Sequence, residues 1–325
     1  MNNQNIIKIT TSSKTSEFQK LDNLFNIHEN YSKSVSNHED CSIVLYTSGT
    51  TGKPKGVPRT HFAERSSAIA HIAQNKYDRY ESTLGVMPLY HTMGVRSLLS
   101  MTLLNGNFII QPKFNPEEAI EFIDKNKISS LYLVPTLYHD LIDSPHFKIE
   151  KVSSCHKLGF AGAPMTDGLL KKIKKNFSAS QLINHYGSSE IYTFTIEPNA
   201  LEKPGCAGKA GINQNIRVIK INSNNINDKT KENEEGEIIA YIKNDEAFKG
   251  YLNRPDADQT SIINDWYFTK DTGYFDQNGD LFVTGRVDDM IITGGENVFP
   301  IEIENVISLH PEVEEVVVVG LKDEK

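Results

Sequence analysis

The sequence predicts an α/β protein: a partial large domain, with a parallel α/β sheet and a small β subdomain, followed by the start of a small α+β domain. Three observations carry this prediction. Strand-like and helix-like segments alternate from residue 41 to about residue 205. Short strand-like runs separated by Asn, Gly and Asp turns follow, and the pattern changes again after Arg286. We therefore expect a poorly ordered lead-in (1–40), a partial large domain (41–287), and a hinge with a truncated small domain (288–325).

The alternating segment has recognisable boundaries. Cys41 opens a short strand-like run that leads directly into a glycine-rich loop. Asn115 is a predicted helix N-cap, because a proline and two acidic residues follow it in the first turn. Ile120 and Ile123 lie on the apolar side of that helix. A second, basic helix has its apolar side at Leu169, Leu170, Ile173 and Phe177, and strands are predicted at 130–134 and 181–184.

Past Gly205 the pattern predicts an antiparallel β subdomain, with runs that begin at Ile216, Glu237 and Leu281. The polar tract 222–235 is a predicted surface loop. Beyond Arg286 we expect a strand at 290–293, a helix opening at Pro300 and a strand at 313–319. One such βαβ-like piece buries its own faces poorly, which predicts that the small domain is incomplete.

Composition and charge restrict the class of function. The chain has 325 residues, of which 38% are hydrophobic and 23% charged, and its net charge is -8. This acidic balance argues against non-specific binding to nucleic acid. No segment approaches the ~20 apolar residues of a membrane span, and the N-terminus lacks the apolar run of a signal peptide. Because Cys41, Cys155 and Cys206 form no CxxC pair, we expect a reduced, cytoplasmic protein; the sequence does not indicate its oligomeric state.

The stretch YTSGTTGKPKG, residues 46–56, is typical of a phosphate-binding loop. It is not a Walker loop, because Pro54 stands where the second glycine of that motif is required. Its glycines nevertheless let the backbone approach a ligand closely, and its N–H and hydroxyl groups can donate to phosphate oxygens while two lysines add charge. The alternative is a solvated Gly/Thr turn. The predicted phosphate contacts are Thr47, Ser48, Gly49, Thr50, Thr51, Gly52, Lys53 and Lys55.

With five further motifs in the same order, this loop resembles the adenylate-forming superfamily of acyl-CoA synthetases, aryl-acid ligases and luciferases. The motifs are PLYHTMG (88–94), FAGAPM (160–165), NHYGSSE (184–190), the long WYFTKDTGYF…FPIEIE stretch (266–304) and EEVVVVG (314–320). Within the superfamily they most resemble the 4-chlorobenzoate and other benzoate-type CoA ligases. The resemblance runs from about residue 41 to the C-terminus.

The resemblance implies ATP-dependent activation of a carboxylic acid, through an acyl-adenylate, with Mg²⁺ as the cation and CoA as the thiol acceptor. Glu190 would hold Mg²⁺, and Ser189 stands where the family usually has Thr. Asp271 would accept from the ribose hydroxyls, and Arg286 would support the ribose or phosphate. Tyr186 would stack on the adenine. The segment Gly162, Ala163 and Pro164 would lie along that base, next to Gly187 and Ser188 in the nucleotide site.

The acyl pocket is implied by the same motifs. PLYH offers no acid to pair with an ammonium group, which disfavours an amino-acid substrate. Gly187 stands where acetate-activating relatives carry Trp, so the pocket should admit a larger aryl or medium acyl group. The catalytic candidates are Thr47, Lys53, His91 and Glu190, and the pocket candidates are Met87, His91, Thr92, Met93, Gly187, Tyr192 and Thr193.

The resemblance also assigns the last part of the chain. Asp288 matches the hinge about which the small domain rotates. Gly294, Gly295, Glu296 and Asn297 match the turn that serves thiol transfer. Two family features are missing: the α/β section before the phosphate loop and the catalytic lysine near the end of the small domain. Two alternatives therefore stay open, an inactive fragment that only binds nucleotide, and transfer of the acyl group to a carrier protein instead of CoA.

Overall fold

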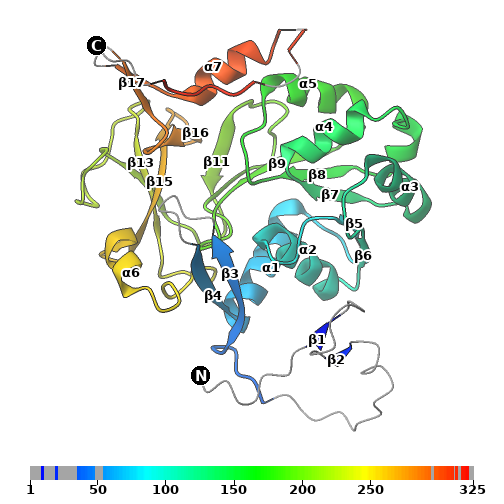
Figure 1. Ribbon diagram of the computed structural model, residues 1–325, viewed down its shortest axis with the longest axis horizontal. Coiled ribbons are helices and arrows are strands. Elements are labelled where there is room, and N and C mark those ends of the chain that lie inside the picture. Colours follow the sequence, from blue (N-terminus) through cyan, green and yellow to red (C-terminus); the bar gives the residue numbers. More distant parts are fainter. Residues whose placement is uncertain are drawn as a thin grey trace. The chain divides into compact units, whose positions relative to one another are not determined.

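The computed structural model describes residues 9–10, 19–20, 35–47, 54–293, 296–310, 312–313 and 316–321 (Figure 1). The chain divides into two compact units, 1–37 and 38–325. In the first unit, β1 (Ile9–Thr10) and β2 (Gln19–Lys20) form a parallel pair. The predicted domain boundaries at 40 and 287 stay predictions.

The second unit is organised around a 12-stranded mixed sheet. Its parallel half has the strand order β6–β5–β7–β8–β9, as the sequence predicts for alternating strands and helices. Because these strands are parallel, the segments that follow them all emerge at one edge of the sheet. The strands are β5 (Ser82–Gly85), β6 (Asn107–Ile110), β7 (Ser130–Leu133), β8 (Lys157–Phe160) and β9 (Gln181–Tyr186).

Two groups of helices pack against this parallel half (Figure 1). Leu131 and Leu133 join a core cluster with side chains of α3, α4 and α5, whereas Tyr132 packs with Met93 of α2. Since side chains alternate along a strand, α2 lies on the face opposite to α3–α5. The helices are α1 (His61–Asn75), α2 (Thr92–Leu103), α3 (Pro116–Asn126), α4 (Pro135–Asp143) and α5 (Asp167–Asn176), with a 3₁₀ turn at Ile149–Val152.

The antiparallel half continues the same sheet. Strand β10 (Thr195–Glu197) pairs antiparallel with β9 and then with β11 (Cys206–Ala210), which brings in the later strands. The predicted antiparallel runs are therefore confirmed, but hydrogen bonding through β10 joins them to the main sheet. The remaining elements are β12 (Ile216–Ile219), β13 (Gly236–Tyr241), α6 (Pro255–Ser261), β14 (Ile262–Ile263), β15 (Trp266–Phe275) and β16 (Leu281–Arg286).

Two smaller pairs of strands complete the described structure. A hairpin of β3 (Cys41–Thr47) and β4 (Lys55–Thr60) precedes α1, and β17 (Ile291–Thr293) pairs with β18 (Glu296–Val298) before α7 (Pro300–Ile307). The prediction of a strand at 313–319 is wrong for its described part, since 316–321 is not in a strand. Val317 and Val319 are exposed, and the Val318 N–H between them donates to a Glu304 carboxylate oxygen at 2.9 Å and not to a neighbouring strand.

Candidate functional site

The phosphate-type loop is the connection of the β3–β4 hairpin. Thr47 and Lys55 face each other in the last register pair before it. The loop residues Ser48, Gly49, Thr50, Thr51, Gly52 and Lys53 lie outside the described residues. The Thr47 hydroxyl oxygen is buried and has no hydrogen-bond partner in the described part of the chain. A buried hydroxyl left free in this way is available to a ligand.

Glu190 lies beside this hairpin. The Ser188 hydroxyl accepts from the backbone N–H groups of Glu190 and Ile191, at 3.2 and 3.3 Å, which makes a tight turn after β9. The Glu190 side chain is buried, and its Oε1 accepts a hydrogen bond of 2.6 Å from the Tyr251 hydroxyl. Lys55 Nζ lies 3.2 Å from the same hydroxyl. A buried carboxylate near a free hydroxyl group fits the oxygen ligands that Mg²⁺ prefers.

A second acid-centred cluster lies next to the first. Asp271 on β15 accepts from the Tyr186 hydroxyl at 2.7 Å and from Arg286 Nη1 at 2.8 Å. Burial raises the pKa of Asp271, and the Tyr186 hydrogen bond and the Arg286 guanidinium oppose that rise. The Glu190 carboxylate is close enough to raise the same pKa. The three residues predicted around the adenosine are thus brought together, with Glu190 at their side.

Three predicted site residues and Val134 lie at the carboxyl edge of the parallel strands. Met87 follows β5, Val134 follows β7, Gly162 follows β8 and Gly187 follows β9. Met87 and Val134 pack with the buried side chains of Met93, Tyr132 and Ala161. A Cβ on Gly162, whose φ is +87°, would lie 3.3 Å from Val134 Cγ1. Ala163 and Pro164 are exposed. This edge therefore presents an apolar wall directly beside Tyr186 and Gly187.

His91 and Thr92 stand at the start of α2. His91 is the N-cap, and its Nδ1 accepts from the backbone N–H of Met93 at 3.3 Å. Partial desolvation of the ring, together with the Arg96 guanidinium, lowers the pKa of His91. The neutral imidazole can therefore accept at Nδ1. His91 therefore has a structural role as the N-cap of α2. The sequence did not reveal this role, because histidine is an uncommon N-cap.

Arg96 and the residues after Glu190 form a second wall of the candidate site. The fully buried Arg96 donates to the Thr193 hydroxyl at 2.6 Å and to the Tyr192 carbonyl at 3.4 Å, and it also contacts the Tyr132 hydroxyl. A Cβ on Gly187 would lie 2.2 Å from the Tyr192 carbonyl oxygen. The backbone itself therefore leaves no room for a side chain at position 187. Ser189 and Glu190 follow in the same turn.

Sequence reasoning missed three residues of this site, which are Arg59, Tyr251 and the Arg96 just described. Arg59, fully buried on β4, pairs with Glu64 at 2.9 Å and donates to the Glu190 carbonyl at 3.1 Å. Its guanidinium also lies 3.9 Å from the centre of the Tyr192 ring. Tyr251, noted above, was not singled out either. The only signal for Arg59 was its place just after the phosphate-type loop; nothing local indicated Tyr251.

The predicted hinge and thiolation residues lie on the C-terminal segment. Asp288 is exposed in the turn that follows β16. Gly294 and Gly295 lie outside the described residues, and for Glu296 and Asn297 the structure describes only their backbone in β18. The roles of these residues stay predictions.

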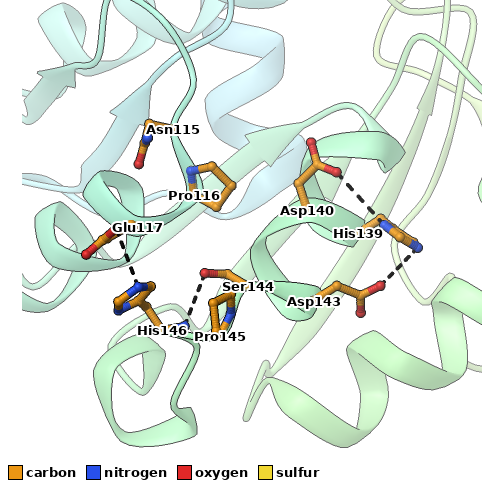
Figure 2. Close-up of a pocket in the computed structure, with 9 residues that line it drawn as sticks. All are labelled: Asn115, Pro116, Glu117, His139, Asp140, Asp143, Ser144, Pro145 and His146. Carbon is orange, nitrogen blue, oxygen red and sulfur yellow. Dashed lines mark hydrogen bonds and ion pairs between the residues drawn. The ribbon is translucent and has the colours of Figure 1, made fainter.

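Two other clusters of ionisable side chains contain ion pairs of their own. The buried side chains of Glu197, Cys206 and Asp280 come within 4.8 Å of one another, but Lys203 Nζ already lies 2.6 Å from Asp280 Oδ2. Figure 2 shows a surface cavity of about 570 Å³ between the start of α3 and the end of α4. There His139 Nε2 lies 3.1 Å from Asp143 Oδ2 and His146 Nε2 lies 3.5 Å from Glu117 Oε2 (Figure 2). None of the residues that line this cavity is a predicted site residue.

No helix in the described part of the chain is long and apolar enough to cross a membrane.

Comparisons of the whole chain with known proteins agree with one another. Residues 2–252 match the family described as AMP-binding enzyme. A 4-chlorobenzoate–CoA ligase of Arthrobacter sp is 34% identical over 288 residues, which cover 88% of this chain and 54% of that protein. A long-chain-fatty-acid–CoA ligase of Bacillus subtilis is 31% identical, with 89% of this chain and 51% of that protein covered. This chain thus spans about half the length of the curated relatives it matches.

Solved structures agree with the sequence comparison. An O-succinylbenzoate coenzyme A synthetase of Bacillus subtilis, in complex with ATP and magnesium ion, superposes with a TM-score of 0.83 at 27% identity, covering 97% of this chain and 66% of that one. ATP-bound MatB of Rhodopseudomonas palustris gives a TM-score of 0.82 at 27% identity, covering 92% and 59%. The predicted fold class and the predicted resemblance are both confirmed.

Proposed function

We propose a function from one premise: this chain belongs to the AMP-binding enzyme family. We infer that it activates a carboxylic acid with ATP. A carboxylate oxygen of the acid forms a bond to the α-phosphorus, the bond from that phosphorus to pyrophosphate breaks, and an acyl-adenylate results. The thiol of CoA then attacks the acyl carbon, AMP leaves with the bonding electron pair, and the products are a thioester and AMP.

One observation carries this proposal: two acid-centred clusters converge beside an apolar wall. Asp271 is held between Tyr186 and Arg286 and would accept from ribose hydroxyls. Glu190 lies beside Lys55 and the phosphate-type hairpin, and it would hold Mg²⁺, which would neutralise charge on the polyphosphate. Nucleotide and acid would therefore be oriented together, which is the main requirement of this reaction.

The apolar wall favours an aryl or medium acyl group as the substrate. Met87 and Val134, which pack against the buried Met93, supply hydrophobic surface, and no side chain projects from Gly162 or Gly187. Relatives named for 4-chlorobenzoate, 2-succinylbenzoate and long-chain fatty acids share the family. This range of named acids keeps both aryl and acyl substrates open for this chain.

The test is acid-dependent release of pyrophosphate by the full chain, with ATP, Mg²⁺ and a panel of benzoates and fatty acids, followed by product analysis with CoA. We expect AMP and an acyl-CoA with at least one acid. Glu190→Gln should abolish turnover, and the surface change Glu202→Gln should not. ATP binding without any acid-dependent turnover would favour the nucleotide-binding alternative. An acyl-adenylate that CoA does not consume would favour a carrier-protein acceptor.

A further inference from the structure

The segment between β13 and α6 connects the turn that carries Glu190 with the β3–β4 hairpin. The Phe248 N–H donates to the Glu190 carbonyl at 2.9 Å, and Ala247 forms an isolated bridge with Ile191. Four residues after Phe248, the Leu252 N–H donates to the Gly56 carbonyl at 2.8 Å. One short segment is therefore bonded both to the turn that carries Glu190 and to the hairpin that carries the phosphate-type loop.

The Tyr251 hydroxyl lies at the centre of this connection. Because an ionised carboxylate can only accept, the hydroxyl donates its proton to Glu190 Oε1, at 2.6 Å. Its lone pair is then free to accept from Lys55 Nζ, at 3.2 Å. Lys55 Nζ also lies 4.3 Å from the centre of the Tyr251 ring, which is within the range of a cation–π contact. Hydrogen bonds in such a chain polarise and strengthen one another.

Tyr251 is itself held firmly in place. Its backbone N–H donates to Asp258 Oδ1 at 2.8 Å, and its ring packs edge-on against Phe248 with centroids 5.0 Å apart. The residue is 5% exposed. A rigid donor to Oε1 of Glu190 fixes the orientation of the carboxylate, and with it the direction in which Oε2 points.

We propose that Tyr251 is a positioning residue that orients the Glu190 carboxylate for the Mg²⁺ of MgATP and holds Lys55 until phosphate replaces the tyrosine as its partner. This inference rests on the proposed function. It predicts two separable effects of removing the hydroxyl. Glu190 loses its orientation, so Mg²⁺ binds less well, whereas Lys55 loses a competitor for the phosphate, so nucleotide without metal binds at least as well as before.

The experiment is a calorimetric titration of the full chain with ATP, first in EDTA and then over a range of Mg²⁺ concentrations. For Tyr251→Phe we expect the Mg²⁺ concentration of half-maximal enhancement to rise by about tenfold, because the lost hydrogen bond has a charged acceptor. The affinity for ATP in EDTA should not fall. An unchanged Mg²⁺ requirement, or an equal loss of affinity with and without Mg²⁺, would overturn the proposal.

Three further variants keep the result interpretable. Tyr274→Phe removes the same atom from a tyrosine near the end of β15, away from the Glu190–Tyr251–Lys55 chain, and should leave both affinities unchanged. In a Glu190→Gln background, Tyr251→Phe should have no further effect on the Mg²⁺ requirement, since its target carboxylate is gone. Should Tyr251→Phe fail to fold, Lys55→Met serves instead: it must weaken ATP binding in EDTA and leave the Mg²⁺ requirement near that of the wild type. The opposite pattern for Lys55→Met would count against the proposal.

The two levels of inference fail in different ways. A wild-type chain that binds no ATP would refute the proposed function and this inference together. A wild-type chain whose ATP binding is enhanced by Mg²⁺, with a Tyr251→Phe variant that behaves identically, would refute the positioning role of Tyr251 alone.

Discussion

Arg286 lies opposite Asp271 in the β15–β16 ladder, and its Nη1 is 2.8 Å from Asp271 Oδ1. The other carboxylate oxygen accepts from the Tyr186 hydroxyl, at 2.7 Å. Two donors from two different elements thus fix the plane of one partly buried carboxylate. A carboxylate oriented in this way is suited to accept from both hydroxyls of a ribose, because each of its oxygens keeps further lone pairs.

We expect Asp271→Asn to remove the preference of the chain for a ribose. The amide keeps the size of the side chain but replaces one acceptor oxygen with a donor. The wild type should bind ATP about tenfold more tightly than 2′,3′-dideoxy-ATP, which is the effect of losing hydrogen bonds to a charged group, and the variant should bind the two nucleotides nearly alike. Calorimetry with both nucleotides measures the ratio. Asp265→Asn, on the surface, is the control, and a variant that keeps the wild-type ratio would exclude Asp271 from the ribose site.

Local signals in the sequence predict α3 and α5 well. Asn115 accepts from the Glu118 N–H at 2.9 Å as the N-cap of α3, with Pro116 in the first turn. Leu169, Leu170 and Ile173 are buried on α5. In each case the interactions that decide the structure lie within one turn of helix, so the residues that make them are close in the sequence.

Long-range pairing is what the sequence alone does not reveal. Strand β10 is three residues long, yet it joins the parallel and antiparallel halves of the sheet. Tyr251 contacts Glu190 although the two are 61 residues apart in sequence. The run 313–319 has the composition of a strand, but a strand also needs a partner. The resemblance named Glu190 and Asp271; only the fold shows which side chains hold them.

The N-cap at His91 allows its structural and chemical roles to be separated. His91→Ala should lower the free energy of unfolding by ~1 kcal/mol, because the Met93 N–H loses its acceptor. His91→Asn should restore that stability, since asparagine is a favoured N-cap. If the imidazole also borders the acyl pocket, His91→Asn should remain slow in thioester formation. Urea unfolding and single-turnover kinetics on both variants check this, and full activity of His91→Asn would limit the histidine to capping.

The close approach at Gly187 predicts a strong effect of a single methyl group. In Gly187→Ala the new Cβ would meet the Tyr192 carbonyl oxygen at 2.2 Å, so the turn that carries Glu190 has to shift. We expect a loss of stability of about 2–3 kcal/mol together with weaker binding of MgATP. Gly205→Ala is the matched control: its φ is +72° but nothing lies within 4 Å, so a loss of ~1 kcal/mol from backbone strain is expected. Equal stability losses would contradict the steric argument.

Glu246 predicts how stability depends on pH. Burial raises the pKa of Glu246 from 4.5 to about 7, although Arg96 and Arg59 oppose the rise. The folded state therefore keeps a proton that the unfolded state has released, so the contribution of this group to stability is full below pH ~4.5 and is lost as pH rises to about 7. Glu246→Gln has no such group, and its stability relative to the wild type should increase by on the order of 1–3 kcal/mol between pH 4.5 and 7.5. Urea unfolding at both pH values measures this, with the exposed Glu202→Gln as control. A difference between Glu246→Gln and wild type that stays constant with pH would show that Glu246 does not titrate in this range.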